Sequence, residues 1–222
     1  MADKVGISDL AKTLFPEYRA GVITASVENS EYDESLWQKI DDLTEQIRTT
    51  YTVSDIKLLP TIQATRNAYK IAGKDPNRYR PSAEALMRRL INGNDLYKIS
   101  TLVDLINLVS LKTGYSIGGF DRDKIEGTPI LGVGVENEKF EGIGRGLLNI
   151  AGLPVYRDDK GGIGTPTSDE VRTSISLNTK NILIIINGYS GKEGLNEAVD
   201  YTISLLKIFA KAIDVSYQIV AP

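Results

Sequence analysis

The sequence of 222 residues contains no cysteine and no histidine. Without cysteine there is no disulfide, thiolate metal site or cysteine nucleophile, and without histidine there is no imidazole base or imidazole metal ligand. Any catalysis must therefore use carboxyl, amine, hydroxyl or guanidinium groups, backbone amides or a bound water. A metal ion would have to be a hard cation on oxygen ligands, and we expect neither a metal nor another cofactor.

Long apolar segments are missing as well. No apolar run approaches the roughly 20 residues of a membrane-spanning helix, and the N-terminus MADKVGISDL lacks the apolar segment of a secretory signal. We therefore expect a cytoplasmic protein without a membrane partner. With 41% hydrophobic and 25% charged residues, the chain has the composition of an ordinary globular protein with a core.

Positive charge gathers in one part of a chain whose net charge is −3. Residues 57–98 hold nine Lys or Arg against three Asp or Glu, a local net charge of +6, with three tyrosines among them. Such a block could follow a phosphate backbone and stack on bases. The alternative is a solvated pair of helices whose charges share no face. The predicted RNA-binding residues are Arg78, Arg80, Arg88 and Arg89.

The apolar pattern predicts helices and strands in a mixed order. The predicted helices are 34–47, a helix from Pro60 to Gly73, a helix from Pro81 to Leu90, 101–113 and 193–213. The predicted strands are 18–28, 128–136, a hairpin at 155–164, 181–189 and 215–220. Helices packed beside a sheet-rich body indicate an α+β fold rather than a regular βαβ array.

The segment TLVDLINLVSLKTG, residues 101–114, is apolar nearly all round but carries one thin polar stripe. Thr101, Asp104, Asn107 and Ser110 recur at every third position and so share one face of the predicted helix. The stripe could face a ligand pocket. It could equally cap neighbouring loops, since buried polar groups need partners in any protein.

Glycine is frequent in three segments, at 114–121, 132–146 and 160–170. Glycine allows positive φ and close approach of a ligand to the backbone, so these segments could be loops that line a pocket. Tight turns of a sheet explain them as well. None has the spacing and the strand–turn–helix setting of a phosphate-binding loop.

The segment TPTSDE, residues 165–170, concentrates hydroxyls and carboxylates beside the third glycine segment. With no imidazole in the chain, a carboxylate next to hydroxyls is the best-placed substitute base. Asp169 could orient a water, while Thr167 or Ser168 could hold the amino group or the ribose of a substrate. We therefore predict these three residues as catalytic, the alternative being that they only shape a turn.

Two segments carry a family resemblance. RYRPSAEALMRRLINGNDLYKISTLVDLINLVSLKTGYSIGGFDRDKIEG (78–127) and RDDKGGIGTPTSDEVRTSISLNTKNILIIING (157–188) resemble the B3/B4 domain of the phenylalanyl-tRNA synthetase beta subunit, in its free-standing form. The resemblance covers roughly residues 20–215 and is most specific from Leu96 to Gly127. It implies a three-layer sandwich of two β-sheets and a helical layer, with no synthetase catalytic domain.

The resemblance also has consequences for domain organisation and function. We expect a single domain of this kind over residues 1–222, with specific resemblance at 78–190 and an N-terminal helical extension at 1–17. In the synthetase this domain holds an editing pocket that hydrolyses tyrosine wrongly esterified to phenylalanine tRNA. The implied partner is therefore tRNA or aminoacyl-tRNA.

Two signature polar groups of the family are absent. Gly118 stands where the family places a histidine, and Ile185 stands where it places the glutamate that recognises the tyrosine hydroxyl. Asn107, Asp121 and Glu126 lie on matching positions. The predicted substrate-binding residues are Asn107, Gly118, Gly119, Glu126, Gly161 and Gly162.

Three classes of function remain open. The first is an esterase that hydrolyses mischarged aminoacyl-tRNA in trans, where positioning a water and stabilising an oxyanion could suffice without histidine. The second is a non-catalytic module that binds RNA or an amino-acid-like ligand. The third is an interaction protein that uses the acidic segment 28–45.

Overall fold

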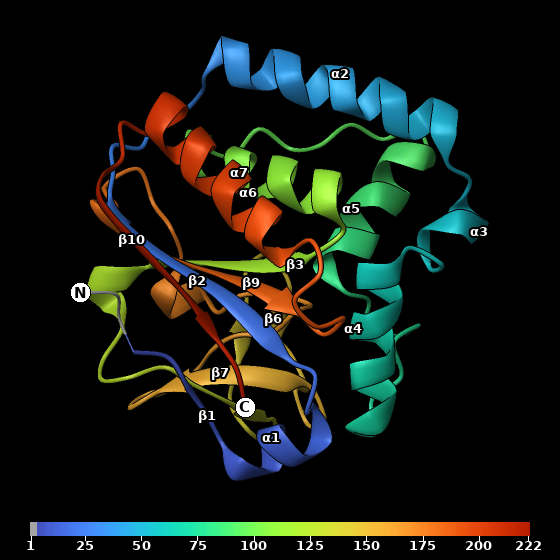
Figure 1. Ribbon diagram of the computed structural model, residues 1–222, viewed down its shortest axis with the longest axis vertical. Coiled ribbons are helices and arrows are strands. Elements are labelled where there is room, and N and C mark those ends of the chain that lie inside the picture. Colours follow the sequence, from blue (N-terminus) through green and yellow to red (C-terminus); the bar gives the residue numbers. More distant parts are fainter. Residues whose placement is uncertain (1–3) are drawn as a thin grey trace.

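Two four-stranded β-sheets face each other, and a layer of helices covers the outer face of one of them (Figure 1). This arrangement comes from a computed structural model, which describes residues 4–222. The first three residues of the predicted N-terminal extension lie outside the described residues. The three layers confirm the α+β sandwich of two sheets and a helical layer.

The central sheet has the strand order β10 (Ile213–Val220), β2 (Arg19–Ser26), β9 (Asn181–Gly188) and β3 (Ser116–Asp121), with all neighbours antiparallel. Side chains alternate between its two faces. Ile182, Ile184 and Ile186 pack toward the helices, whereas Leu183 and Ile185 pack toward the second sheet. Because both faces are covered, residues 182–186 of β9 form one continuous apolar run.

The second sheet has the order β1 (Gly6–Ile7), β4 (Ile130–Val133), β7 (Pro154–Asp158) and β8 (Gly161–Gly164). In the chain segment that connects β4 to β7, β5 (Glu141–Gly142) and β6 (Gly146–Leu147) form a small separate hairpin. In the segment predicted as a helical extension, β1 pairs with β4 and is followed by α1 (Asp9–Leu14).

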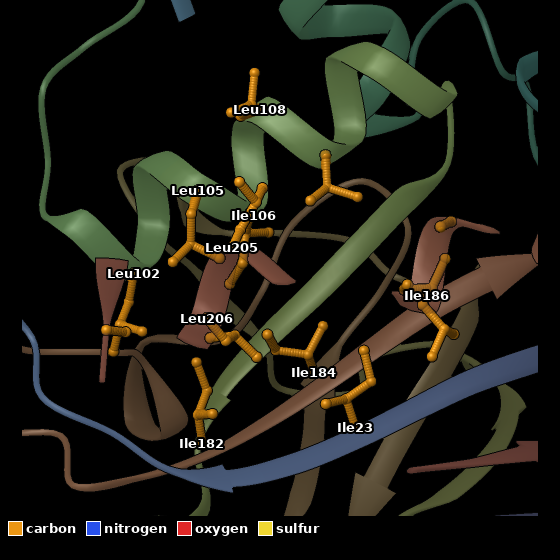
Figure 2. Packing of buried hydrophobic residues seen from close by; sticks show 14 of the residues in the cluster. Ile23, Leu102, Leu105, Ile106, Leu108, Ile182, Ile184, Ile186, Leu205 and Leu206 are labelled. Atoms are coloured by element: carbon orange, nitrogen blue, oxygen red, sulfur yellow. The ribbon is translucent and has the colours of Figure 1, made fainter. Parts of the chain in front are cut away.

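Helices α6 (Thr101–Thr113) and α7 (Leu195–Phe209) pack on the central sheet, and α2 (Glu34–Thr50) packs on α6 at the outer side of the helical layer (Figure 1). Figure 2 shows Leu102 and Leu105 of α6 and Leu206 of α7 on the side of the sheet to which Ile182 and Ile184 of β9 point. The other helices, α3 (Val53–Ile56), α4 (Pro60–Ile71) and α5 (Ser82–Ile91), lie at one end of the layers (Figure 1). Two 3-10 turns, Arg122–Lys124 and Val171–Thr173, follow β3 and β8. No helix among residues 4–222 is both long and apolar enough to cross a membrane.

The helices and strands predicted from the apolar pattern are confirmed within a few residues at their ends. The glycine loop expected at 114–121 is wrong, because Ser116–Asp121 forms β3. The two glycines in this strand serve close packing on both faces. A Cβ at Gly118 would lie 2.6 Å from the ring of Phe120, and one at Gly119 would lie 2.5 Å from Cδ1 of Ile106.

Candidate functional site

Three residues of the α6 polar stripe make structural hydrogen bonds, and the fourth borders a cavity. Thr101 shares a hydrogen bond of 2.6 Å with the hydroxyl of Ser30, and Ser110 donates to the carbonyl of Tyr115 at 2.7 Å. Asp104 is almost completely buried. Its carboxylate accepts from Trp37 Nε1 at 2.8 Å and from the amide of Ile99 at 3.2 Å.

Burial raises the pKa of Asp104, against the hydrogen bonds that it accepts. These contacts agree with the interpretation that the stripe caps neighbouring loops, and they hold for Thr101, Asp104 and Ser110. Asn107 differs from them, since its side chain makes no hydrogen bond to any residue of the described chain and borders a cavity.

This cavity, the α6–β3 pocket, has a volume of about 330 Å³ and opens between α6, β3, α5 and the loop 165–175. Its walls are mainly aliphatic, from side chains that include Leu86, Val103, Ile106, Ile117 and Ile175. Its polar lining residues are Ser82, Asn107, Ser110, Thr165, Ser168, Asp169 and Ser174. A mostly apolar pocket of this size with a few polar groups is typical of a site for a small ligand.

Asp169 is the one acidic residue that lines the α6–β3 pocket. Its Oδ2 accepts a hydrogen bond of 3.1 Å from the amide of Gly119, and no cation of the described chain pairs with it. Burial raises the pKa of Asp169 to about 7, and the Gly119 hydrogen bond lowers it only in part. The carboxyl group therefore changes protonation near neutral pH, where a general base is most useful.

Glycine makes room for this carboxyl group. A Cβ at Gly164 would lie 2.8 Å from Oδ1 of Asp169, and one at Gly118 would lie 3.4 Å from the same atom. Gly164 and Asp169 are also paired by an isolated β-bridge, which holds the loop against β8. Of the predicted glycine and loop residues, Gly119, Ser168 and Asp169 border the pocket, while Gly118 lies behind the carboxyl group.

Thr167 and Ser168 have different surroundings. Thr167 is buried, and its hydroxyl shares a hydrogen bond of 2.8 Å with Tyr69, so the structure places it outside the pocket lining and in a structural contact. Ser168 does line the pocket, and its hydroxyl donates to the carbonyl of Asp169 at 3.3 Å. Only Ser168 and Asp169 of the predicted catalytic group therefore border the cavity.

Three predicted substrate-binding residues lie away from the pocket. Gly161 and Gly162 are at the start of β8, where Gly161 has φ of 142° and Gly162 packs against Phe140. Glu126 is exposed and forms an ion pair with Lys160. Sequence reasoning missed Ser82 and Leu86 of α5, Ile143 of the β5–β6 hairpin and the pair Ser174 and Ile175. Nothing in the local pattern of these residues indicates that they share a pocket.

A comparison with known protein families identifies the family of the chain. A sequence model of the family described as "B3/4 domain" matches residues 64–215, more than half of the chain. The chain belongs to the B3/4 domain family. This confirms the resemblance that residues 78–127 and 157–188 indicated.

A solved structure is also similar to this B3/4 chain. It is an N-terminal fragment of the phenylalanyl-tRNA synthetase beta-subunit from Pyrococcus horikoshii, with 16% sequence identity and a TM-score of 0.44. The similarity covers 97% of this chain and 50% of the fragment, so this chain spans about half the length of that structure. A comparison with curated proteins gives no match.

The two positions at which the sequence resemblance would place polar groups are neighbours across two strands. Gly118 of β3 is paired with Ile185 of β9. Ile185 is completely buried in the cluster between the sheets, to which Phe120 and Tyr156 also belong. The space beside Gly118 is filled by the ring of Phe120 and by the carboxyl group of Asp169, and the open pocket of this chain lies where Gly119, rather than Gly118, forms the wall.

The four predicted RNA-binding arginines have different surroundings. Arg88 donates to Glu84 at 2.8 Å, so its charge is paired within the protein. Arg89 donates to the carbonyl of Asp95 at 2.6 Å and lies over the ring of Tyr97, 4.0 Å from its centroid. Arg78 and Arg80 are exposed. Among residues 4–222, no group of three or more Asp or Glu could hold a metal ion.

Proposed function

We propose that the chain binds the aminoacyl end of a tRNA in the α6–β3 pocket and hydrolyses a mischarged aminoacyl ester in trans. The observation that carries the proposal is Asp169, a carboxyl group with its pKa raised to about 7 at the wall of an open pocket. Membership of the B3/4 family, together with the resemblance to a domain that edits tRNA, supports the substrate class.

The pocket lining favours an amino acid with an apolar side chain. The aliphatic wall formed by residues such as Leu86, Val103 and Ile175 would hold that side chain away from water. A volume of about 330 Å³ suits an amino acid and part of a ribose rather than a whole nucleotide with its amino acid. The polynucleotide would then remain outside the pocket.

Asp169 and Asn107 have complementary roles in the proposed reaction. The Asp169 carboxylate accepts a proton from a water molecule as the water oxygen forms a bond to the ester carbonyl carbon. The unpartnered amide of Asn107 donates to the carbonyl oxygen as negative charge develops on it. The bond from carbonyl carbon to ribose oxygen then breaks, and the ribose oxygen takes the proton from Asp169.

Gly119 has a supporting role in this mechanism. Its amide is already used by Asp169 Oδ2, so it orients the carboxyl group and is not free to bind the ester oxygen. We therefore assign binding of the oxyanion to the side chain of Asn107 rather than to glycine amides. We assign contact with the amino group of the substrate to Ser168, which lies next to Asp169 at the pocket wall.

A binding module without chemistry is the second candidate, because the same carboxyl group could pair with the α-amino group of an amino-acid-like ligand. Turnover separates the two candidates. The acidic side chains of segment 28–45, which suggested an interaction protein, are mainly exposed.

The test is single-turnover deacylation of tRNAs charged with apolar, aromatic and acidic amino acids. We expect the wild type to hydrolyse esters of apolar amino acids above the uncatalysed rate, and Asp169→Asn to lose about 10²-fold or more of that rate. Asp200→Asn, the same chemical change at an exposed position of α7, is the matched control. Equal rates in all three proteins would remove Asp169 from the mechanism, and no hydrolysis by the wild type would leave the binding module.

A further inference from the structure

A second cavity, the α4 groove, lies on the solvent side of α4 and has a volume of about 350 Å³. It is separate from the α6–β3 pocket, with which it shares no residue. Its lining residues are Lys57, Leu58, Gln63, Arg66, Asn67, Lys70 and Asn77. Three of the seven are cations, three are amides, and none is a carboxylate.

Helical spacing explains why these groups meet. Gln63, Arg66, Asn67 and Lys70 stand at positions i, i+3, i+4 and i+7 of α4 and therefore form one stripe along the helix. Residues 57–58 follow α3 and reach the same stripe from one side, and Asn77 reaches it from the turn after α4. The opposite face of α4 is buried, and there Tyr69 contacts Thr167 near the pocket loop.

The positive charge of the α4 groove is only partly neutralised. Arg66 donates to Glu84 at 2.7 Å, to Asn77 Oδ1 at 2.7 Å and to the carbonyl of Pro76 at 3.2 Å. Glu84 is completely buried and also accepts from Arg88, so its one negative charge is shared between two arginines. Lys57 and Lys70 are exposed and have no ion pair or hydrogen bond from their ammonium groups within the described chain.

The amides add donors of the same kind. Asn77 Oδ1 is occupied by Arg66, which leaves the Asn77 amide nitrogen as a donor toward the groove. The side chains of Gln63 and Asn67 make no hydrogen bond to any described residue. A cavity with several free donors, two free ammonium groups and no carboxylate favours an anion.

We propose that the α4 groove binds phosphate groups of an RNA backbone. This inference rests on the proposed function, in which the chain acts on tRNA, and it names where the polynucleotide outside the pocket is held. Flexible lysines along an open groove suit successive backbone phosphates, which are held as point charges without base recognition. The proposal also assigns the main RNA contact to Lys57 and Lys70 rather than to the predicted Arg88 and Arg89, because these arginines have partners within the protein.

The test measures binding of uncharged tRNA as a function of salt concentration, for the wild type and for a Lys57→Gln/Lys70→Gln variant. Both lysines are exposed and unpaired, so the variant should fold normally. If both contact phosphates, the slope of log K against log salt should be less steep by about 1.4 to 1.8, because fewer counterions are released. A Lys39→Gln/Lys207→Gln variant makes the same charge change on exposed residues of α2 and α7 and should keep the wild-type slope.

A slope that changes equally in both variants, or in neither, would overturn the groove assignment even if the wild type deacylates tRNA. Because uncharged tRNA has no ester, this result is independent of catalysis at Asp169. A second measurement compares inorganic phosphate at millimolar concentration with tRNA, as protection of the groove lysines against chemical acetylation. Protection by phosphate but not by tRNA would indicate a small-anion site rather than a backbone site and would also contradict the proposal.

Discussion

At the scale of single residues, Asp169 and Asp104 show how surroundings decide what a carboxyl group with a raised pKa does. Both have a raised pKa because burial disfavours the charged form. Asp104 is enclosed by donors from Trp37 and Ile99 and is a structural group. Asp169 has a single backbone donor and borders a cavity, so its proton can be exchanged with a ligand or a water.

The raised pKa of Asp169 predicts a stability effect of the opposite sign to most substitutions of buried residues. Its pKa of about 7 in the folded chain exceeds the value of about 3.9 in an unfolded chain, so the folded state binds the proton more tightly. Stability from this group is therefore complete below about pH 4 and is lost as the pH rises to about 7. Asp169→Asn should be about as stable as the wild type at pH 4 and more stable by about 2 to 4 kcal/mol at pH 8.

Denaturant unfolding of both proteins at the two pH values checks this, since all other titrating groups are common to them. An Asp169→Asn variant that is less stable than the wild type at pH 8 would support the alternative in which TPTSDE only shapes a turn.

The division of the α6 stripe gives a second prediction. Asp104→Ala leaves the Trp37 and Ile99 donors without an acceptor and should lower the free energy of unfolding by about 2 to 4 kcal/mol. Asn107→Ala breaks no hydrogen bond and should cost less than about 1 kcal/mol, while slowing deacylation about 10-fold or more. A comparison of unfolding and single-turnover rates separates the two roles. A large stability loss in Asn107→Ala would mean that this residue is structural like its neighbours.

At the scale of elements, α4 connects the two proposed sites. One face carries the α4 groove, and the other carries Tyr69, whose hydroxyl contacts Thr167 in the loop that also holds Asp169. Burial raises the pKa of Tyr69 well above its ordinary value, so the hydroxyl stays neutral and can share its proton with Thr167. The loop at the pocket wall is therefore fixed to a helix rather than to its own turn alone.

This connection predicts that Thr167 affects stability but not turnover. Thr167→Val removes the buried hydrogen bond to Tyr69 and should lower the free energy of unfolding by about 1 to 3 kcal/mol. Tyr69→Phe should have a similar effect, and the double variant should lose less than the sum of the two. Deacylation by the folded Thr167→Val protein should remain within a few-fold of the wild type. A rate loss as large as that of Asp169→Asn would return Thr167 to the catalytic group.

The elements show which features of the fold the sequence predicts and which it does not. The apolar period predicts α6 and β9, because both are determined by burial of nearby side chains. It does not predict that Asp104 pairs with Trp37 and that Asn107 has no partner, since partners 67 residues apart leave no local signal. Gly118 and Gly119 were expected in a loop, yet they occupy a strand because side chains on both faces need their space.

At the scale of the whole molecule, the three layers place the pocket at the open edge of the central sheet. β3 is the last strand of that sheet, so α5, α6 and the loop 165–175 meet beside it without another strand to fill the space. The family resemblance predicts these layers and the segments that meet. It does not predict which side of β3 is open, because that depends on Phe120 and Ile185 filling the other side.

The central claim is that Asp169 is the base in hydrolysis of an aminoacyl ester bound in the α6–β3 pocket. The most direct test is the pH dependence of single-turnover deacylation, after subtraction of the uncatalysed rate, for the wild type and Asp169→Asn. The account predicts that the wild-type rate rises with pH, levels off above about 7 and is absent from the variant, because only the ionised carboxyl group accepts the proton. A rate that shows no inflection near pH 7, or that Asp169→Asn retains in full, would contradict it.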